Sequence, residues 1–119
     1  MFYTYRQNNS YGVFDVDEHV KHYVIIEADA ASEADKKAEN LGIYFDGVEK
    51  GRDCPCCGDR WHKAYSLGAG IEGTKEPEIW GQSALKYLKE NGKFLEEEAI
   101  IYYKDGKVEV LSKKDLYDK

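Results

Sequence analysis

Residues 20–27, Val-Lys-His-Tyr-Val-Ile-Ile-Glu, decide how this chain folds. The run from Tyr23 to Ile26 is apolar at every position, so it has no polar side to turn toward water. A strand of this kind is buried on both of its faces, whereas a strand with one wet face alternates apolar and polar residues. We therefore expect residues 20–27 to form a central strand of a sheet.

Several further strands are predicted on either side of this run. Residues 2–6 alternate aromatic and polar side chains, and residues 13–16 resume an extended pattern after a turn-rich stretch. Residues 61–67 predict a short strand, and residues 99–103 and 108–111 are rich in β-branched and aromatic side chains. An Asp-Gly pair between the last two segments is typical of a hairpin turn, so we expect them to pair.

Two helices are expected between the strands. Asp29 is suited to cap the first helix, and Gly42 to end it. The second helix covers residues 83–90 and should stop at the Asn-Gly pair that follows. The positions expected to face inward are Ala34, Ala38 and Leu41 in the first helix, and Ala84, Leu85 and Leu88 in the second.

This order of elements predicts an α+β fold with a mostly antiparallel sheet, two short helices on one face and a Cys-rich turn. A chain of 119 residues is long enough to bury one core and too short for two. We therefore expect a single domain over residues 1–119, with the Lys-rich residues 112–119 as a frayed tail.

The charge balance limits the partners. A net charge of −6 makes general binding to nucleic acid or to an anionic membrane unfavourable. No apolar stretch approaches the ~20 residues that cross a bilayer, and residues 1–6 lack the pattern of a secretion signal. We expect a cytoplasmic protein that binds neither membranes nor nucleic acid in general.

The Cys-rich turn, Cys-Pro-Cys-Cys-Gly at residues 54–58, resembles half of a zinc knuckle. Cys54 and Cys57 are three residues apart, a spacing at which both thiolates can reach one tetrahedral ion. No second pair of this spacing exists in the chain, so His62 is the nearest candidate for a further ligand. Cys56 and one of His19 and His22 are the other possible donors. Three interpretations stay open: a bound zinc ion, a zinc ion shared between subunits, and buried thiols without metal.

Residues beside the turn could bind an anion. Arg52 and Arg60 flank it, and their planar guanidinium groups suit phosphate. Trp61 follows directly and could stack on a base. The alternative is structural, with Trp61 in the core and Arg60 paired to Asp59 or Asp53.

A second polar group lies at the end of the first predicted strand. Tyr5, Arg6 and Asn8 offer an aromatic ring, a guanidinium and an amide in close sequence. They could join the anion site, or they could belong to a solvated hairpin loop. The chain shows no P-loop, no H-E-x-x-H helix and no clear acid–base pair, so we expect a protein without catalytic activity.

These residues carry a resemblance. Residues 2–10, 44–48, 54–61 and 77–79 together resemble an uncharacterised family of small tailed-bacteriophage proteins that carry a Cys-Pro-Cys-Cys-Gly-Asp-Arg-Trp motif. The resemblance runs over nearly the whole chain and implies no catalytic residues. It implies an accessory protein that acts in the host cytoplasm, where such proteins include inhibitors of antiviral defence. One class of these, the sponge proteins, forms compact oligomers that sequester nucleotide-derived immune signals without cleaving them.

Two functions follow as expectations. The first is a homo-oligomeric sponge for a small, anionic, nucleotide-like ligand, with Arg6, Arg52 and Arg60 on the phosphates and with Trp61 and Tyr5 on the base. The alternative is a zinc-supported interaction module whose acidic surface binds and modulates a host protein. A hydrolase or thiol enzyme ranks below both.

Overall fold

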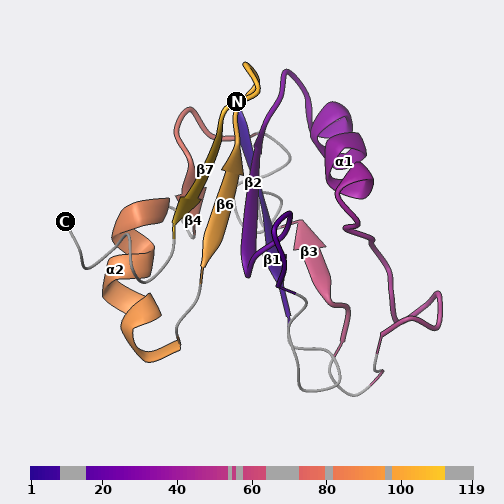
Figure 1. The fold of residues 1–119 in the computed structure, drawn as a ribbon. Helices are drawn as coiled ribbons and strands as arrows, with labels where there is room; N and C mark the ends of the chain where they lie inside the picture. The colour runs from indigo at the N-terminus through magenta and orange to yellow at the C-terminus, as the bar shows by residue number, and fades with distance from the viewer. Residues whose placement is uncertain are drawn as a thin grey trace.

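The computed structural model describes residues 1–8, 16–53, 55, 58–63, 73–79, 82–95 and 98–111. The elements along the chain are β1 (Phe2–Gln7), β2 (Tyr23–Glu27), α1 (Ala31–Asn40), β3 (Trp61–Lys63), β4 (Glu78–Ile79), β5 (Gln82–Ser83), α2 (Ala84–Leu95), β6 (Ala99–Tyr102) and β7 (Val108–Leu111). The fold is α+β, as expected from the sequence (Figure 1).

The main sheet has five strands in the order β3-β1-β2-β6-β7, so β2 lies at its centre as predicted. Three of the four strand pairs are antiparallel, and only β2 and β6 run parallel. The small second sheet, β4 paired with β5, has no counterpart in the sequence-based prediction. Two-residue strands carry too little pattern to be recognised from sequence.

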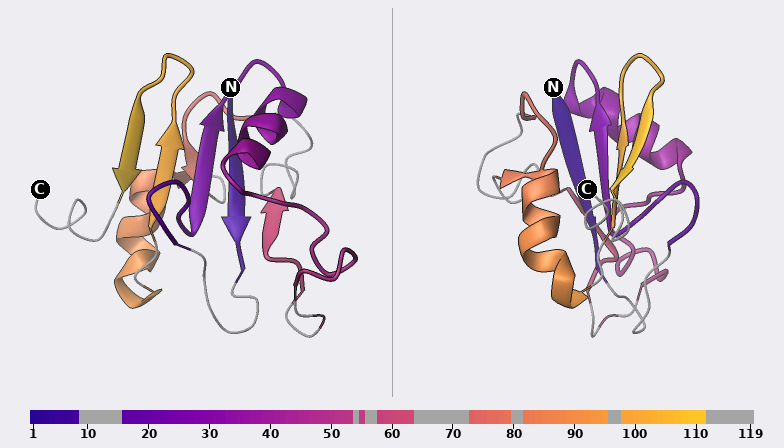
Figure 2. Two further views of the ribbon diagram at one scale, coloured as in Figure 1. Left: turned by 45° about the vertical axis from the view of Figure 1, so that its right-hand side comes forward. Right: turned by 60° about the vertical axis from the view of Figure 1, so that its left-hand side comes forward.

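The two helices cover opposite faces of the sheet, so the expectation that both lie on one face is wrong (Figures 1 and 2). On the α1 face, Ala34 and Ala38 pack with Tyr3, Tyr5, Val24, Ile26 and Ile100. On the α2 face, Ala84 and Leu88 pack with Phe2, Tyr23, Ile25, Ala99 and Ile101. The reason lies in β2, because a central strand that is apolar on both sides needs a helix over each.

The ends of α1 follow the prediction only in part. Gly42 has φ +100° after the helix and provides the expected stop. The N-cap residue is Ala30, without a side-chain cap, and not Asp29. The Asp29 carboxylate forms an ion pair with Lys104 in the turn between β6 and β7. This pairing links the start of α1 to the hairpin.

Helix α2 runs on past the expected stop and ends at Leu95. A glycine inside a helix costs only about 1 kcal/mol relative to alanine, so Gly92 can remain in the helix. Ala84 and Leu88 face the core as predicted, but the side chain of Leu85 is 41% exposed. Positions 84 and 88 share one side of a helix, and position 85 is turned away by about 100°.

The β6–β7 hairpin confirms the predicted Asp-Gly turn. Gly106 has φ +96°, a conformation that glycine adopts without strain. The Tyr103 N–H donates to Lys107 O at 2.8 Å, which closes the hairpin. Within the described residues, no helix is long and apolar enough to cross a membrane.

Some predictions fall on residues outside the described part of the chain: the extended segment at 13–15, the strand continuation at 64–67, the three cysteines and the tail at 112–119.

Candidate functional site

Arg60 lies inside the protein in a polar network. Its side chain is 6% exposed, and its Nη1 donates to Gln7 Oε1 at 3.3 Å. The Arg60 backbone N–H donates to Asp53 Oδ2 at 2.8 Å, and the Tyr44 hydroxyl donates to Asp53 Oδ1 at 2.6 Å. Burial, and then the Asp53 carboxylate, raise the pKa of Tyr44. The network therefore ties the segment before β3 to the end of β1.

Trp61 and Tyr5 are also interior. Trp61 is 4% exposed and Tyr5 is fully buried, both in the core beneath α1. The Tyr5 hydroxyl donates to Asp35 Oδ1 of α1 at 2.7 Å, and its ring lies 5.8 Å from that of Phe45. A platform for base stacking needs a ring face open to the ligand. The geometry thus matches the alternative given above, with Trp61 in the core and Arg60 paired to Asp53.

The remaining predicted ligand residues do not converge on one surface. Arg6 is paired with His62 across β1 and β3, on the α2 face, whereas Tyr5 and Trp61 lie on the α1 face. Adjacent residues of a strand point to opposite faces, which separates Arg6 from Tyr5. The structure does bring Asn8 to Arg60, through a hydrogen bond from Asn8 N–H to Arg60 O at 2.5 Å.

Arg52 is the exposed member of the predicted set. Its Cζ lies 3.8 Å from the centre of the Tyr44 ring, a cation–π contact at the surface of the buried network. Arg52 and Arg60 therefore lie near the same residue, Tyr44, with Arg52 exposed at the surface and Arg60 buried in the interior.

The predicted metal ligands can be placed only in part. Cys54, Cys56 and Cys57 lie outside the described residues. His62 lies in β3 and is partly buried. Among the described residues there is no group of three or more His, Cys, Asp or Glu side chains that could hold a metal ion. The zinc site therefore stays a prediction.

A different site appears where α1 meets the β6–β7 turn. A cleft of about 270 Å³, here called the α1 cleft, lies between the C-terminal half of α1 and the turn. Its lining includes Ile26, Lys37, Asn40, Leu41, Tyr102 and Lys104. The carboxylate of Glu27 also lines the cleft, and its Oε1 accepts a hydrogen bond from the Lys104 backbone N–H at 2.9 Å. Ile26 and Leu41 supply an apolar surface, and Tyr102 supplies an aromatic one.

Tyr102 is held in place by its hydroxyl. This group donates to the backbone oxygen of His19 at 2.5 Å, which fixes the ring against the cleft. Burial, and then the charge of Asp17, raise the pKa of Tyr102, so its hydroxyl keeps its proton at neutral pH. The ring is therefore a fixed wall of the cleft.

Two ammonium groups lie at the cleft, each in a solvated ion pair. Lys37 Nζ is 3.3 Å from Glu33 Oε1, an i, i+4 pair on α1, and Lys104 Nζ contacts Asp29 Oδ1. The hydrogen bond between Lys104 and Asp29 raises the pKa of Lys104 and lowers that of Asp29. Exposed pairs of this kind contribute only about 0–1 kcal/mol, so an incoming phosphate can compete with the carboxylates.

Sequence reasoning missed the α1 cleft. The sequence pattern does not single out Lys37 or Tyr102 as a ligand residue. The cleft arises from the packing of α1 against a hairpin more than sixty residues away in sequence. Within the sequence, the only available signal was an amide and an ammonium three residues apart on one helix, at Lys37 and Asn40.

The comparisons with known proteins give a family and no function. A family model described as a domain of unknown function (DUF7296) matches residues 1–117. No curated protein and no solved structure matches the chain.

Proposed function

Since the chain belongs to the DUF7296 family, whose description names no activity, we propose from its own geometry that it is a non-catalytic binder of a small, nucleotide-like anion. The ligand lies in the α1 cleft. In the phage setting implied by the motif, the protein sequesters a nucleotide-derived immune signal of the host. The observation that carries this proposal is a cleft of about 270 Å³ that combines an apolar surface, a fixed tyrosine ring and two ammonium groups.

The lining suits a base and a phosphate at the same time. Tyr102 can stack on a planar ring, which contributes about 1–3 kcal/mol per base. Asn40 can donate to and accept from the edge of a base, and the ammonium groups of Lys37 and Lys104 attract a phosphate. The volume lies near the lower end of the range for ligand pockets, ~300–1,000 Å³, and therefore suits one nucleotide unit rather than a strand.

The residues around the cleft support binding rather than turnover. The described residues that line it include no His, Cys, Ser or Thr, so a Ser, Cys or Thr nucleophile activated by a histidine is not among them. A site that binds through a ring, an amide and two ammonium groups can hold a ligand without cleaving it.

The test is calorimetric titration, together with thermal shift, using cyclic di-AMP, 3′,5′-cyclic GMP and ADP-ribose as probes. We expect one of these to bind wild-type protein and to bind Lys104→Ala at least about tenfold more weakly, or ~1.4 kcal/mol. Lys86→Ala is the matched control, because Lys86 is an exposed lysine of α2 on the opposite face. Absence of binding for all probes, or equal weakening by both variants, would contradict the proposal.

A second readout addresses turnover and assembly. After incubation, the bound probe should be recovered intact by chromatography, and conversion of the probe would contradict a non-catalytic role. Light scattering of the same sample measures the mass of the complex, which should correspond to a homo-oligomer.

The zinc-supported interaction module is the second candidate, favoured by one observation. Gly58 has φ +86°, and the Gly that follows the second thiolate of a knuckle gives the turn its freedom. In this version Cys54 and Cys57 bind zinc, and the module modulates a host protein. Elemental analysis of purified protein should find near-stoichiometric zinc in the wild type and loss of zinc in Cys57→Ser. Zinc-free wild-type protein would contradict this candidate.

A further inference from the structure

Strand β7 forms one edge of the five-stranded sheet. In an antiparallel strand pair, residues that are hydrogen-bonded to their partner alternate with residues that are not. Tyr103 and Lys107, at the turn between β6 and β7, form a hydrogen-bonded pair. The bonded positions of β7 are therefore Glu109 and Leu111, which face β6. The backbone N–H and C=O groups of Val108 and Val110 point outward from the sheet.

The two residues whose backbone groups point out of the sheet edge have apolar and exposed side chains. Val108 is 49% exposed and Val110 is 39% exposed, and both side chains lie on the α1 face beside Tyr102 and Ile100. Edge strands are normally protected by charged side chains, proline or a bulge, because their free backbone groups invite another strand. Neither valine offers such protection.

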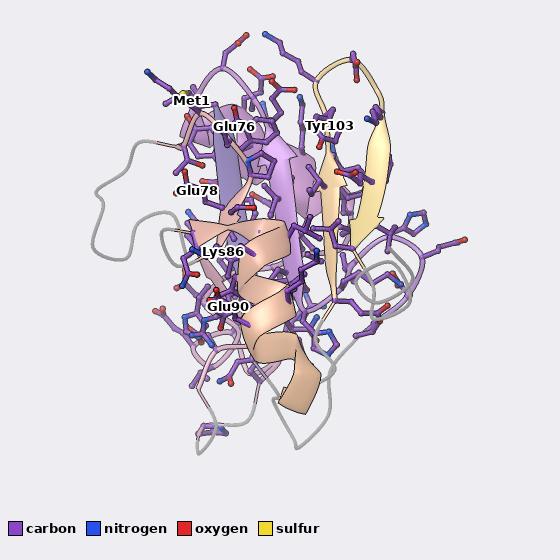
Figure 3. The ribbon with its side chains drawn as sticks, turned by 90° about the vertical axis from the view of Figure 1, so that its left-hand side faces the viewer. Met1, Glu76, Glu78, Lys86, Glu90 and Tyr103 are labelled. Atoms are coloured by element: carbon purple, nitrogen blue, oxygen red, sulfur yellow. The ribbon has the colours of Figure 1, made fainter. Side chains whose placement is uncertain are left out.

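A second cleft adjoins the same strand on the α2 face. It measures about 300 Å³ and lies between β7 and the first turn of α2; we call it the α2 cleft. Leu85 and Leu111 contribute apolar surface, and Glu76 and Glu109 contribute carboxylates. Figure 3 views this face, with Glu76 and Tyr103 labelled above the start of α2.

The lining of the α2 cleft carries two carboxylates, Glu76 and Glu109, and one ammonium group, that of Lys107, lies 5.2 Å from the centre of the Tyr103 ring beside it. Burial, and then the hydrogen-bonded carboxylate of Glu109, raise the pKa of Tyr103, and the charges of Glu27 and Glu76 add to the effect. The whole chain also carries a net charge of −6. A second copy of the chain would bring the same carboxylates to this edge, whereas a basic segment of another protein would neutralise them.

We infer that β7 accepts an extended basic and apolar segment of another protein as an additional strand of the sheet. Main-chain hydrogen bonds to Val108 and Val110 provide the pairing. Side chains alternate along the added strand, so one set packs on the two valines and the other set enters the α2 cleft. There an apolar residue contacts Leu85 and Leu111, and flanking basic residues face Glu76 and Glu109.

The probe is the peptide acetyl-Lys-Val-Leu-Val-Lys-amide, in which Leu and both Lys share one side. The matched control is acetyl-Glu-Val-Leu-Val-Glu-amide. We expect the lysine peptide to bind and to shift amide resonances of residues 84–85 and 108–111, and the glutamate peptide to bind at least tenfold more weakly. No binding of the lysine peptide, equal binding of both peptides, or shifts confined to other residues would overturn the inference.

The protein variant is Val110→Pro, which removes an outward N–H that makes no bond to β6. It should weaken binding of the lysine peptide at least tenfold, whereas Val110→Thr keeps the donor and should bind it normally. If Val110→Pro fails to fold, the lysine peptide is N-methylated instead. This removes the peptide N–H groups that would donate to the backbone C=O groups of Val108 and Val110, and it should abolish binding. Unchanged binding in either case would overturn the inference.

Measurements of dimerisation and of nucleotide binding separate this inference from two other possibilities. Dimerisation of the wild type that Val110→Pro abolishes would identify a second copy as the occupant and overturn the choice of a basic partner. Nucleotide binding in the α1 cleft should be unchanged by Val110→Pro. Lys104 lies at the α1 cleft, and Val110 lies in the edge strand β7. Absence of nucleotide binding would therefore not contradict a positive result with the lysine peptide.

Discussion

The Nε atom of Arg60 lies 4.0 Å from Asp53 Oδ1, and the two side chains are 6% and 1% exposed. Asp53 also accepts hydrogen bonds from the Arg60 backbone N–H and from the Tyr44 hydroxyl. A buried arginine of this kind needs its carboxylate, because an unpaired charge in the interior is very unfavourable. The pair therefore holds the chain before β3 in place.

Asp53→Asn should lower the free energy of unfolding by about 1–3 kcal/mol, since it removes the negative charge beside the buried Arg60 guanidinium and disturbs the two hydrogen bonds that Asp53 accepts. Urea denaturation at pH 7 measures this change. The double variant Asp53→Leu with Arg60→Met removes both charges and should lose less stability than the two single changes added together. Additive losses would contradict coupling between the two side chains.

Gly47→Ala should be much more destabilising than Gly51→Ala. A Cβ at Gly47 would overlap Asp53 Oδ2 and come within 2.8 Å of the Tyr44 ring, so it disrupts the buried network. Overpacking of this kind costs about 1–3 kcal/mol and more where a hydrogen bond is lost. A Cβ at Gly51 meets nothing within 4 Å, and only its φ of +76° is strained, at about 1 kcal/mol. Thermal denaturation of both variants checks the order, and equal losses would contradict it.

The stability of the protein should fall as the pH rises above 10, in part because of Tyr103. Its pKa is raised from 10.0 to about 12, so the stabilising effect is complete below pH 10 and is lost as the pH rises toward 12. Tyr103 is partly exposed, which limits its share to about 1 kcal/mol after solvent screening. Tyr103→Phe should show a flatter loss of stability between pH 9.5 and 11.5 in urea titrations. Parallel curves for the two proteins would contradict the assignment.

The features that could be predicted from the sequence are those that depend on a single strand, turn or helix end. The apolar run at Tyr23–Ile26 places β2 at the centre of the sheet, and the Asp-Gly pair before Lys107 marks the hairpin. Gly42 ends α1 as expected. Each of these depends on local conformation or on the burial of one strand, and both are visible in a short stretch of sequence.

Features that depend on how elements meet in space are not visible in the same way. The run at Tyr23–Ile26 implies cover on both faces of β2, but it does not say which helix covers which face. Arg60 beside Trp61 fits a ligand site as well as it fits a buried anchor. The contacts of Arg60 with Asp53, seven residues earlier, and with Gln7, 53 residues earlier, distinguish the two. The α1 cleft likewise depends on the approach of α1 to a remote hairpin.

Trp61→Ala should lower the free energy of unfolding by about 3–5 kcal/mol, because the indole is 4% exposed and packs in the core beneath α1. Arg52→Ala should change stability by no more than about 1 kcal/mol, since the guanidinium rests on the Tyr44 ring at the surface. Trp61→Phe is the control for Trp61, because it keeps an aromatic side chain and should fall between the wild type and Trp61→Ala. Urea denaturation and nucleotide titration are measured on all four proteins at a temperature where each is folded. A Trp61→Ala protein that keeps its stability but loses nucleotide affinity would show that the indole contacts ligand rather than core, and would move the binding site from the α1 cleft to β3.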